Sequence, residues 1–335
     1  MTKNFNSLDV AKLIAAILVV SIHKNPFHPG LLDDIFVGMM GRIAVSFFYI
    51  ASAFFLFLKT PVTGTTITHY LKRLFILFVF WFVIEVPFMY LKYFANSPTV
   101  YDAMTFVQQL FFGNVYNGAY FIVALIEGVP LVYFLSKFLS NTWLFMIGLI
   151  LYLFCAVCDT YYTVAPMFVR QVADAVNLVI GDISVSFVPA IIFIVAGKVI
   201  ADNYTKISSC NLAYTGLLLI LSMIFYLMEV KNIAWGGYML VSRIPTAILI
   251  FIFVLNIKLE KQLPYKSFRK LSTIIFFSHF IFVEFTYLFY FHFTEVLHLD
   301  NTGQFFFVLL LSLLTYFIMT QGSKKKMFRW MRWGY

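Results

Sequence analysis

Charge is scarce in this chain. Only 12% of the 335 residues are charged, whereas 62% are hydrophobic, and no polar stretch is long enough to fold a soluble core of its own. Long apolar runs instead recur from end to end, which excludes a soluble globular protein and is typical of a polytopic membrane protein. We therefore expect an all-α fold with a single membrane domain over residues 1–335.

Cysteine is almost as scarce, and three residues cannot supply a disulfide scaffold. Cys155 and Cys158 form a C-x-x-C pair inside an apolar run, with no second pair or nearby His to complete a redox or metal site. We interpret them as small buried residues. No His, Cys or Asp set has recognisable ligand spacing, so we expect no metal cofactor.

The apolar runs predict about ten transmembrane helices. The first run ends in His-Lys-Asn-Pro rather than a small-x-small cleavage site, so we expect a retained helix and not a signal peptide. Each run is long enough to cross a bilayer, some with tilt. The predicted spans are 8–24, 41–58, 74–94, 118–136, 142–158, 180–200, 211–228, 238–256, 271–290 and 304–321. The short mixed segment from Tyr101 to Phe112 suggests an interfacial helix.

The distribution of Lys and Arg predicts that both termini lie in the cytoplasm. With the amino terminus inside, seventeen Lys and Arg fall on inner segments and six on outer ones, as the positive-inside rule requires. The segment 322–335 is then a short cytoplasmic tail of a cell-membrane protein. The net charge of +9 is spread over the inner loops and faces anionic membrane lipid, so we do not expect nucleic-acid binding. The oligomeric state stays open.

Two ionisable residues stand out in the first predicted span. Lys12 and His23 are separated by eleven positions, which places both on one face of a helix about 16 Å apart along the axis. Ionisable side chains at membrane depth are costly, and their default interpretation is functional. His23 is a candidate general base because its ordinary pKa lies near neutrality.

Other polar groups also fall inside predicted spans. Glu127 lies in the middle of an apolar run and must face the protein interior, a pocket or a cation, while Glu85 precedes a Val-Pro kink. For polar residues at the ends of predicted spans, snorkelling to the interface or ion pairing is an alternative to a functional role. The remaining candidates are Asp9, Arg42, Asp182, Arg243, His279 and Glu284.

The order of these residues resembles the membrane acyltransferase-3 superfamily, bacterial enzymes that acylate sugars and envelope polymers. Lys12-x10-His23 matches the family's basic residue, ten intervening residues and His. The segment from Arg42 through Ser46 to Ser52 looks like the family's Arg-x-Ala-Val-Pro-Phe-Phe…Ser-Gly-Phe, and Tyr70-Leu-Lys72-Arg73 matches the basic run before the third span. The run from Ser272 to His279 is similar to the late Ser-x3-Tyr-x2-His pattern.

Within this superfamily the chain looks most similar to the membrane domain of the vancomycin-resistance serine racemases. That likeness is carried by Arg-Ile-Ala-Val-Ser-Phe-Phe, by Cys158-Asp-Thr-Tyr-Tyr and by the run from Val188 to Lys198. Relatives show His-Leu-Trp-Tyr-Leu where this chain has Gly118-Ala-Tyr120-Phe-Ile.

The resemblance implies an O-acetyltransferase that uses cytoplasmic acetyl-CoA, or a close acyl-CoA, to acylate a hydroxyl of an envelope glycan or a small acceptor. It implies that Lys12, Lys59, Lys72 and Arg73 hold the CoA phosphates or pantetheine arm. His23 would be the base, oriented by Glu127 or His279, with a covalent acyl-His intermediate as the variant. Arg42, Ser52 and Tyr120 would contact the acceptor.

Two other classes of function stay open at this point. Buried ionisable residues also suit a transporter or flippase for a small acid, peptide or lipid-linked sugar, although no inverted repeat relates the two halves. A membrane sensing or scaffold component is the third class. The sequence does not name the acceptor.

Overall fold

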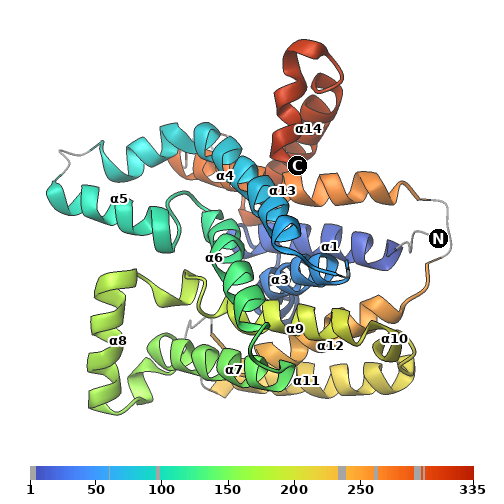
Figure 1. The fold of residues 1–335 in the computed structure, drawn as a ribbon. Coiled ribbons are helices and arrows are strands. Elements are labelled where there is room, and N and C mark those ends of the chain that lie inside the picture. Colours follow the sequence, from blue (N-terminus) through green and yellow to red (C-terminus); the bar gives the residue numbers. More distant parts are fainter. Residues whose placement is uncertain are drawn as a thin grey trace. The chain divides into compact units, whose positions relative to one another are not determined.

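The computed structural model describes residues 5–59, 61–95, 99–232, 239–259, 263–289, 296 and 299–335. In these ranges every regular element is a helix, which confirms the predicted fold class (Figure 1). The pair Gly236-Gly237, which the sequence places between the predicted spans 211–228 and 238–256, lies outside the described residues.

Most of the helical residues belong to long apolar helices. In chain order these are α1 (Asn6–His23), α3 (Arg42–Phe57), α4 (Gly64–Tyr93), α6 (Ala119–Leu135), α7 (Asn141–Cys158), α9 (Ala190–Asp202), α11 (Leu212–Asn232), α12 (Arg243–Asn256), α13 (Tyr265–Leu288) and α14 (Asn301–Gly322). Each overlaps one of the ten predicted spans, although α4 begins ten residues before the predicted span 74–94 and α9 begins ten residues after the start of 180–200. Eight segments of the described residues are long and apolar enough to cross a membrane; two of them extend α3 and α9 toward the amino terminus, as Leu31–Phe57 and Ile183–Asp202. Ala119–Leu135 and Arg243–Asn256 are shorter apolar helices.

Shorter elements connect these helices. They are α2 (Leu31–Asp33), the π-helix η1 (Asp34–Gly41), α5 (Val100–Phe112), η2 (Tyr162–Val164), α8 (Met167–Ile180), η3 (Ile183–Val185), α10 (Tyr204–Ile207) and η5 (Lys326–Gly334). The segment that suggested an interfacial helix forms α5, whose Thr99 and Asp102 make a reciprocal capping box. The Gln108 amide donates to the carbonyl groups of Leu178 and Val179 and so joins α5 to α8.

The chain divides into two compact units. One comprises Met1–Val45, Val79–Phe88 and Lys258–Tyr335, and the other comprises Ser46–Phe78 and Met89–Ile257. The expectation of one membrane domain over the whole chain stays a prediction.

The first unit is built on the packing of α1 against α13 and of α13 against α14. Asp9 near the start of α1 meets Arg269 near the start of α13, and His23 at the end of α1 meets His279, so these helices run in the same direction. Lys24 at the end of α1 meets Gln304 at the start of α14, so α14 runs the opposite way. These directions agree with a chain whose successive spans alternate in direction.

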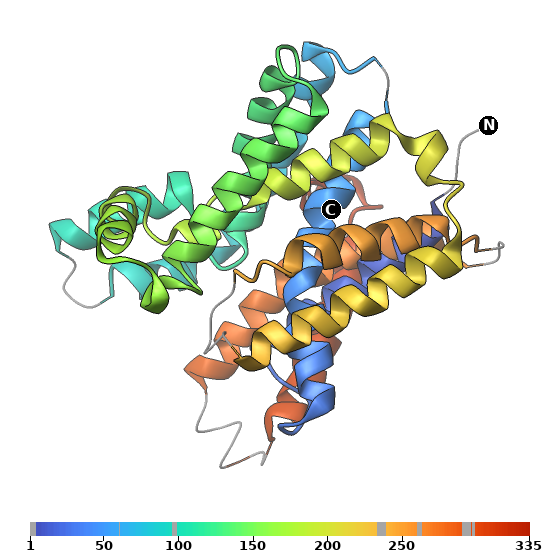
Figure 2. The same cartoon turned by 90° about the horizontal axis from the view of Figure 1, so that it is seen from below.

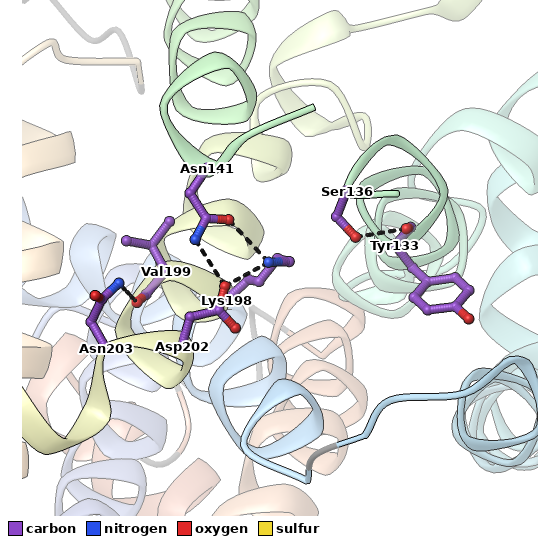
Figure 3. Close-up of polar contacts among 7 residues, drawn as sticks. All are labelled: Tyr133, Ser136, Asn141, Lys198, Val199, Asp202 and Asn203. Carbon is purple, nitrogen blue, oxygen red and sulfur yellow. Dashed lines mark hydrogen bonds and ion pairs between the residues drawn. The ribbon is translucent and has the colours of Figure 1, made fainter. Parts of the chain in front are cut away.

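The second unit contains two antiparallel pairs. Asn141 at the start of α7 meets Lys198 and Asp202 at the end of α9, and Figure 3 shows the three side chains joined by hydrogen bonds of 2.6–3.0 Å. α11 and α12 lie side by side in Figure 2. Their connection is held by Glu229, which accepts hydrogen bonds from the backbone N–H groups of Val241 and Ser242 at 2.9 Å.

One glycine fixes the close approach of α9 to α3 in the second unit. A Cβ at Gly197 would lie 2.8 Å from the Cβ of Ala53 and in contact with the Ile50 carbonyl oxygen. Because small residues allow backbones to approach closely in membrane helices, Gly197 permits this crossing. Cys155 and Cys158 are free thiols buried in α7 of the same unit, as their interpretation as small buried residues expects.

Candidate active site

Helix α1 carries both residues of the basic-x10-His pattern. It runs without interruption from Asn6 to His23, so Lys12 and His23 share one helix as predicted. Both side chains are half-buried, and His23 is the last residue of the helix. Eleven residues of α-helix place the two about 16 Å apart along the axis, with nearly the same azimuth.

His23 lies against His279 of α13. The two ring centroids are 5.4 Å apart, with 43° between the ring planes, and Phe280 packs edge-on against His23 at 4.9 Å. This separation is short enough for one nitrogen of each ring to approach hydrogen-bond distance. The structure therefore brings together two of the three predicted catalytic residues within one unit.

The surroundings of His279 fix its tautomer. Its side chain is completely buried, and its Nδ1 lies 2.9 Å from the Ile275 carbonyl oxygen. A carbonyl oxygen only accepts, so Nδ1 must donate, and in the neutral ring Nε2 keeps its lone pair. Nε2 has no hydrogen-bond partner among the residues that the structure describes. A buried acceptor without a donor is costly, and such groups mark sites where a further partner binds or acts.

Lys24 adds a buried cation directly after His23. Its ammonium donates to Gln304 Oε1 at 2.7 Å and lies 3.9 Å from the centre of the Tyr287 ring. Glu284 is close enough to interact with it electrostatically. Only 4% of Lys24 is exposed. The sequence places Lys24 among the outer charges and gives no sign that it is enclosed by α13 and α14.

The opposite end of the same helix pair holds a closed ion pair. Arg269 Nε and Nη2 donate to the two carboxylate oxygens of Asp9 at 3.0 and 2.7 Å, which is the bidentate geometry of strong Arg–carboxylate pairs. Asp9 is buried, whereas 57% of the Arg269 side chain is exposed. The ion-pair alternative therefore accounts for Asp9, and Arg269 is the partner that sequence reasoning missed.

A π-helix brings Arg42 to the end of α1 that carries His23. Gly41 ends η1, and a Cβ there would lie 2.8 Å from Ile22 Cγ1 and 3.0 Å from the Leu18 carbonyl oxygen. The backbone of η1 thus lies directly on the last turns of α1. Arg42 follows as the first residue of α3 and is half-buried. π-Helical turns are rare and are found mostly at functional sites.

The other predicted residues belong to the second unit. Glu127 is half-buried in α6, and its Oε2 has no hydrogen-bond partner in the described part of the chain. Tyr120 lies seven residues earlier on the same face of that helix. Ser52 of α3 lies beside the buried hydroxyl of Tyr70, far along the helix from its start.

The predicted phosphate ligands lie at the junction of α3 and α4. Lys59 follows α3, and Lys72 and Arg73 lie in the first turns of α4; all three side chains are exposed. Thr63 caps α4 by accepting from the Thr66 N–H.

One further candidate, Asp182, has a structural explanation. Asp182 accepts from the N–H of Ser184 at 2.9 Å and so caps η3. Glu229, which sequence reasoning missed, holds the start of α12. Glu85 is buried in α4 of the first unit.

The family comparison decides the class of protein. A family profile described as an acyltransferase domain, that of acyltransferase family 3, matches residues 5–321. The chain belongs to this family. It is therefore a multi-pass membrane acyltransferase, and the match covers both helices that carry the His23–His279 pair.

A curated relative shares part of this domain. An amino-acid racemase of Enterococcus faecalis is 26% identical over 167 residues, which is 48% of this chain and 23% of the relative. The chain thus spans about a quarter of the length of that relative. The similarity agrees with the resemblance to racemase membrane domains drawn from the sequence. No solved structure matches the chain.

Proposed function

We propose that this acyltransferase moves an acetyl group from cytoplasmic acetyl-CoA to a hydroxyl group of an acceptor on the outer side of the cell membrane. His23 is the general base in this proposal, and His279 is the residue that positions it. The acceptor is an envelope glycan or a small hydroxylated molecule.

The observation that carries the proposal is the paired geometry of His23 and His279. Because Nδ1 of His279 donates to the Ile275 carbonyl oxygen, its Nε2 is left as an acceptor. The ring of His279 lies 5.4 Å, centroid to centroid, from the half-buried ring of His23. An N–H of His23 directed at Nε2 leaves the other His23 nitrogen with a free lone pair. This is the arrangement of a base whose tautomer is set by a second group.

The reaction balances with His23 as the proton carrier. The acceptor hydroxyl attacks the thioester carbonyl carbon while His23 takes its proton, so a C–O bond forms as the C–S bond breaks. The imidazolium then returns the proton to the leaving CoA sulfur, and the base is restored. A completely buried, neutral His279 favours this cycle because its Nε2 can accept a hydrogen bond from His23 without adding a charge beside the imidazolium.

The donor side of the proposal rests on cations. CoA carries phosphates, which Lys and Arg bind through charge-assisted hydrogen bonds, and Lys59, Lys72 and Arg73 are exposed at the predicted inner side. Lys12 lies in the first turns of α1, about three turns from His23, where it can contact the slim pantetheine arm. These residues are proposed ligands of acetyl-CoA, and no metal is required.

The test is acetyl transfer by purified protein in lipid nanodiscs. Radiolabelled acetyl-CoA is supplied with an envelope fraction from the host, and both CoA release and acceptor labelling are followed. His23→Ala should lower the rate by about 10²–10⁴-fold, the usual contribution of a general base. His28→Ala is the matched control, because His28 is an exposed histidine five residues further along the chain.

The two variants separate chemistry from folding. Equal losses in both, or a His23→Ala rate within a few-fold of the parent, would contradict the role of His23. Substrate flux in liposomes without acetyl-CoA would instead favour the transporter alternative.

A further inference from the structure

The second unit contains a polar cluster around Arg243, the first residue of α12. Its Nε donates to Ser46 Oγ of α3 at 2.9 Å, and its guanidinium carbon lies 6.0 Å from the centre of the Phe193 ring of α9. The side chain is half-buried. A guanidinium has five N–H donors in a fixed fork, and the Ser46 hydroxyl takes one of them.

Two tyrosines bring hydroxyl groups to the same cation. Tyr49 of α3 packs against Phe121 of α6 with ring centroids 5.0 Å apart, so it lies beside the start of the helix that carries Tyr120. Both tyrosines are within electrostatic range of Arg243. Both rings come from the first two turns of their helices. No hydrogen bond of either hydroxyl occurs among the described contacts of the chain.

The position of Arg243 is held by its neighbours. The Tyr152 hydroxyl of α7 donates to the Leu240 carbonyl oxygen at 2.8 Å, three residues before Arg243. Glu229 accepts from Val241 and Ser242, so this nearby carboxylate holds the start of α12. These contacts hold the backbone of the three residues before Arg243 and so fix the position from which its side chain extends.

Four helices that run in the same direction contribute residues to the cluster. Tyr120, Phe193 and Arg243 lie near the starts of α6, α9 and α12, and Ser46 and Tyr49 lie in the first half of α3; all four helices are even-numbered spans. By the predicted topology these starts lie at the outer side, where the acceptor arrives. The partial positive charge of helix amino termini adds to that of Arg243 and favours an anion there.

We propose that Arg243, Tyr49 and Tyr120 bind an anionic group of the acceptor, a carboxylate or a phosphate ester. The Arg fork matches the paired oxygens of either group, and each phenol can donate one further hydrogen bond. This proposal rests on the proposed acetyl transfer and names the chemical class of its acceptor. A neutral analogue would not balance the positive charge of Arg243, which makes the site selective for anionic acceptors.

The experiment measures anion binding without requiring turnover. Thermal unfolding of the protein in nanodiscs is followed against glucose, glucuronate and glucose 6-phosphate at constant ionic strength. These three sugars differ in having no anion, a carboxylate or a phosphate ester. One anionic sugar should raise the melting temperature in a saturable way, and glucose should not. The stronger of the two identifies the preferred anion.

The variants assign the effect to the cluster. Arg243→Gln should weaken the apparent affinity for the anionic sugar at least about tenfold, and Tyr49→Phe about threefold, because each removes donors from the oxyanion. Arg170→Gln is the matched control, since the Arg170 guanidinium also bonds through Nε and also lies 6.0 Å from an aromatic ring, that of Tyr162. Its affinity should equal that of the parent. If Arg243→Gln does not fold, Tyr49→Phe and Tyr120→Phe decide the question.

The outcomes separate this proposal from the proposed reaction. The absence of a saturable shift with either anion, or an unchanged affinity in Arg243→Gln, would overturn the anion site. CoA release from acetyl-CoA is measured on the same parent preparation. CoA release without anion binding would contradict only the anion site at Arg243. Anion binding without CoA release would contradict only the proposed reaction with acetyl-CoA.

Discussion

The two ends of the α1–α13 pair hold polar contacts of opposite character. At one end, Asp9 and Arg269 form a closed, doubly hydrogen-bonded ion pair. At the other end, His23 and His279 face each other, and the Nε2 of His279 has no partner among the described residues. The same two helices thus contain one polar contact that is complete and one that is not.

This difference separates structure from chemistry. A satisfied ion pair fixes the register of two helices and has little left to offer a substrate. An acceptor that is buried without a donor lowers stability by about 1–3 kcal/mol, which a protein tolerates where the group acts. We therefore expect mutations at the His23 end to alter rate and mutations at the Asp9 end to alter stability.

After the replacement of His23 itself, the largest effect within this comparison is expected at His279. His279→Leu keeps an apolar side chain of similar size and removes the acceptor for His23. We expect kcat to fall about 10²-fold, while the KM for acetyl-CoA and the melting temperature change little. His279→Gln should recover part of kcat, because its amide oxygen can reach the position of Nε2.

Steady-state kinetics with thermal unfolding of each variant checks this expectation. Equal kcat values in His279→Leu and His279→Gln would show that His279 only fills space. A parallel loss of kcat and melting temperature would show the same.

A smaller effect, on stability, is expected at the other end. Asp9→Asn removes the charge from the ion pair, and because the Arg269 side chain is 57% exposed, the loss should be about 1–2 kcal/mol. Equilibrium unfolding in detergent should detect it, while kcat stays within about twofold. In Asp9→Asn with Arg269→Gln the two losses should not add, since each single change breaks the same pair. A large loss of kcat in Asp9→Asn would contradict the expectation that the Asp9 end of the helix pair affects stability and not rate.

The smallest effect concerns basic residues that make no ion pair with a carboxylate in the described structure. Lys72 and Arg73 are exposed in α4, as Arg269 is in α13, but unlike Arg269 they form no ion pair with a carboxylate among the described residues. Lys72→Gln with Arg73→Gln should raise the KM for acetyl-CoA about tenfold, or roughly 1.4 kcal/mol, with the melting temperature unchanged. Added salt should mimic the effect in the parent, because exposed phosphate contacts are screened. An unchanged KM would leave these residues with a role in topology alone.

The membrane helices were predictable because their signal is local. Each of the ten apolar runs forms an apolar helix, and the spacing of Lys12 and His23 already places both on α1. The sequence also offered Glu127 and His279 as alternatives for orienting His23, and the structure brings His279 to it. Such a choice depends on which helices pack together, which one sequence does not contain.

The missed residues are those whose partners lie far away in the chain. Arg269 is 260 residues from Asp9, and Lys24 is 280 residues from Gln304. The contact between Asp9 and Arg269 had a usable signal in the sequence. Both residues lie close to the beginning of an odd-numbered predicted span, and odd-numbered spans start on the same side of the membrane. Lys24 gave no such signal, because a Lys after a helix end usually lies in solvent.

The π-helix η1 holds one residue more than an α-helix of the same length would hold. Its wider turns take up that residue, and Gly41 packs its last turn on Ile22 and Leu18. Deleting one residue between Asp34 and Gly41 would allow α-helical winding and keep Arg42 near its present direction. The same deletion inside the regular helix α1 would instead turn all following side chains by about 100°.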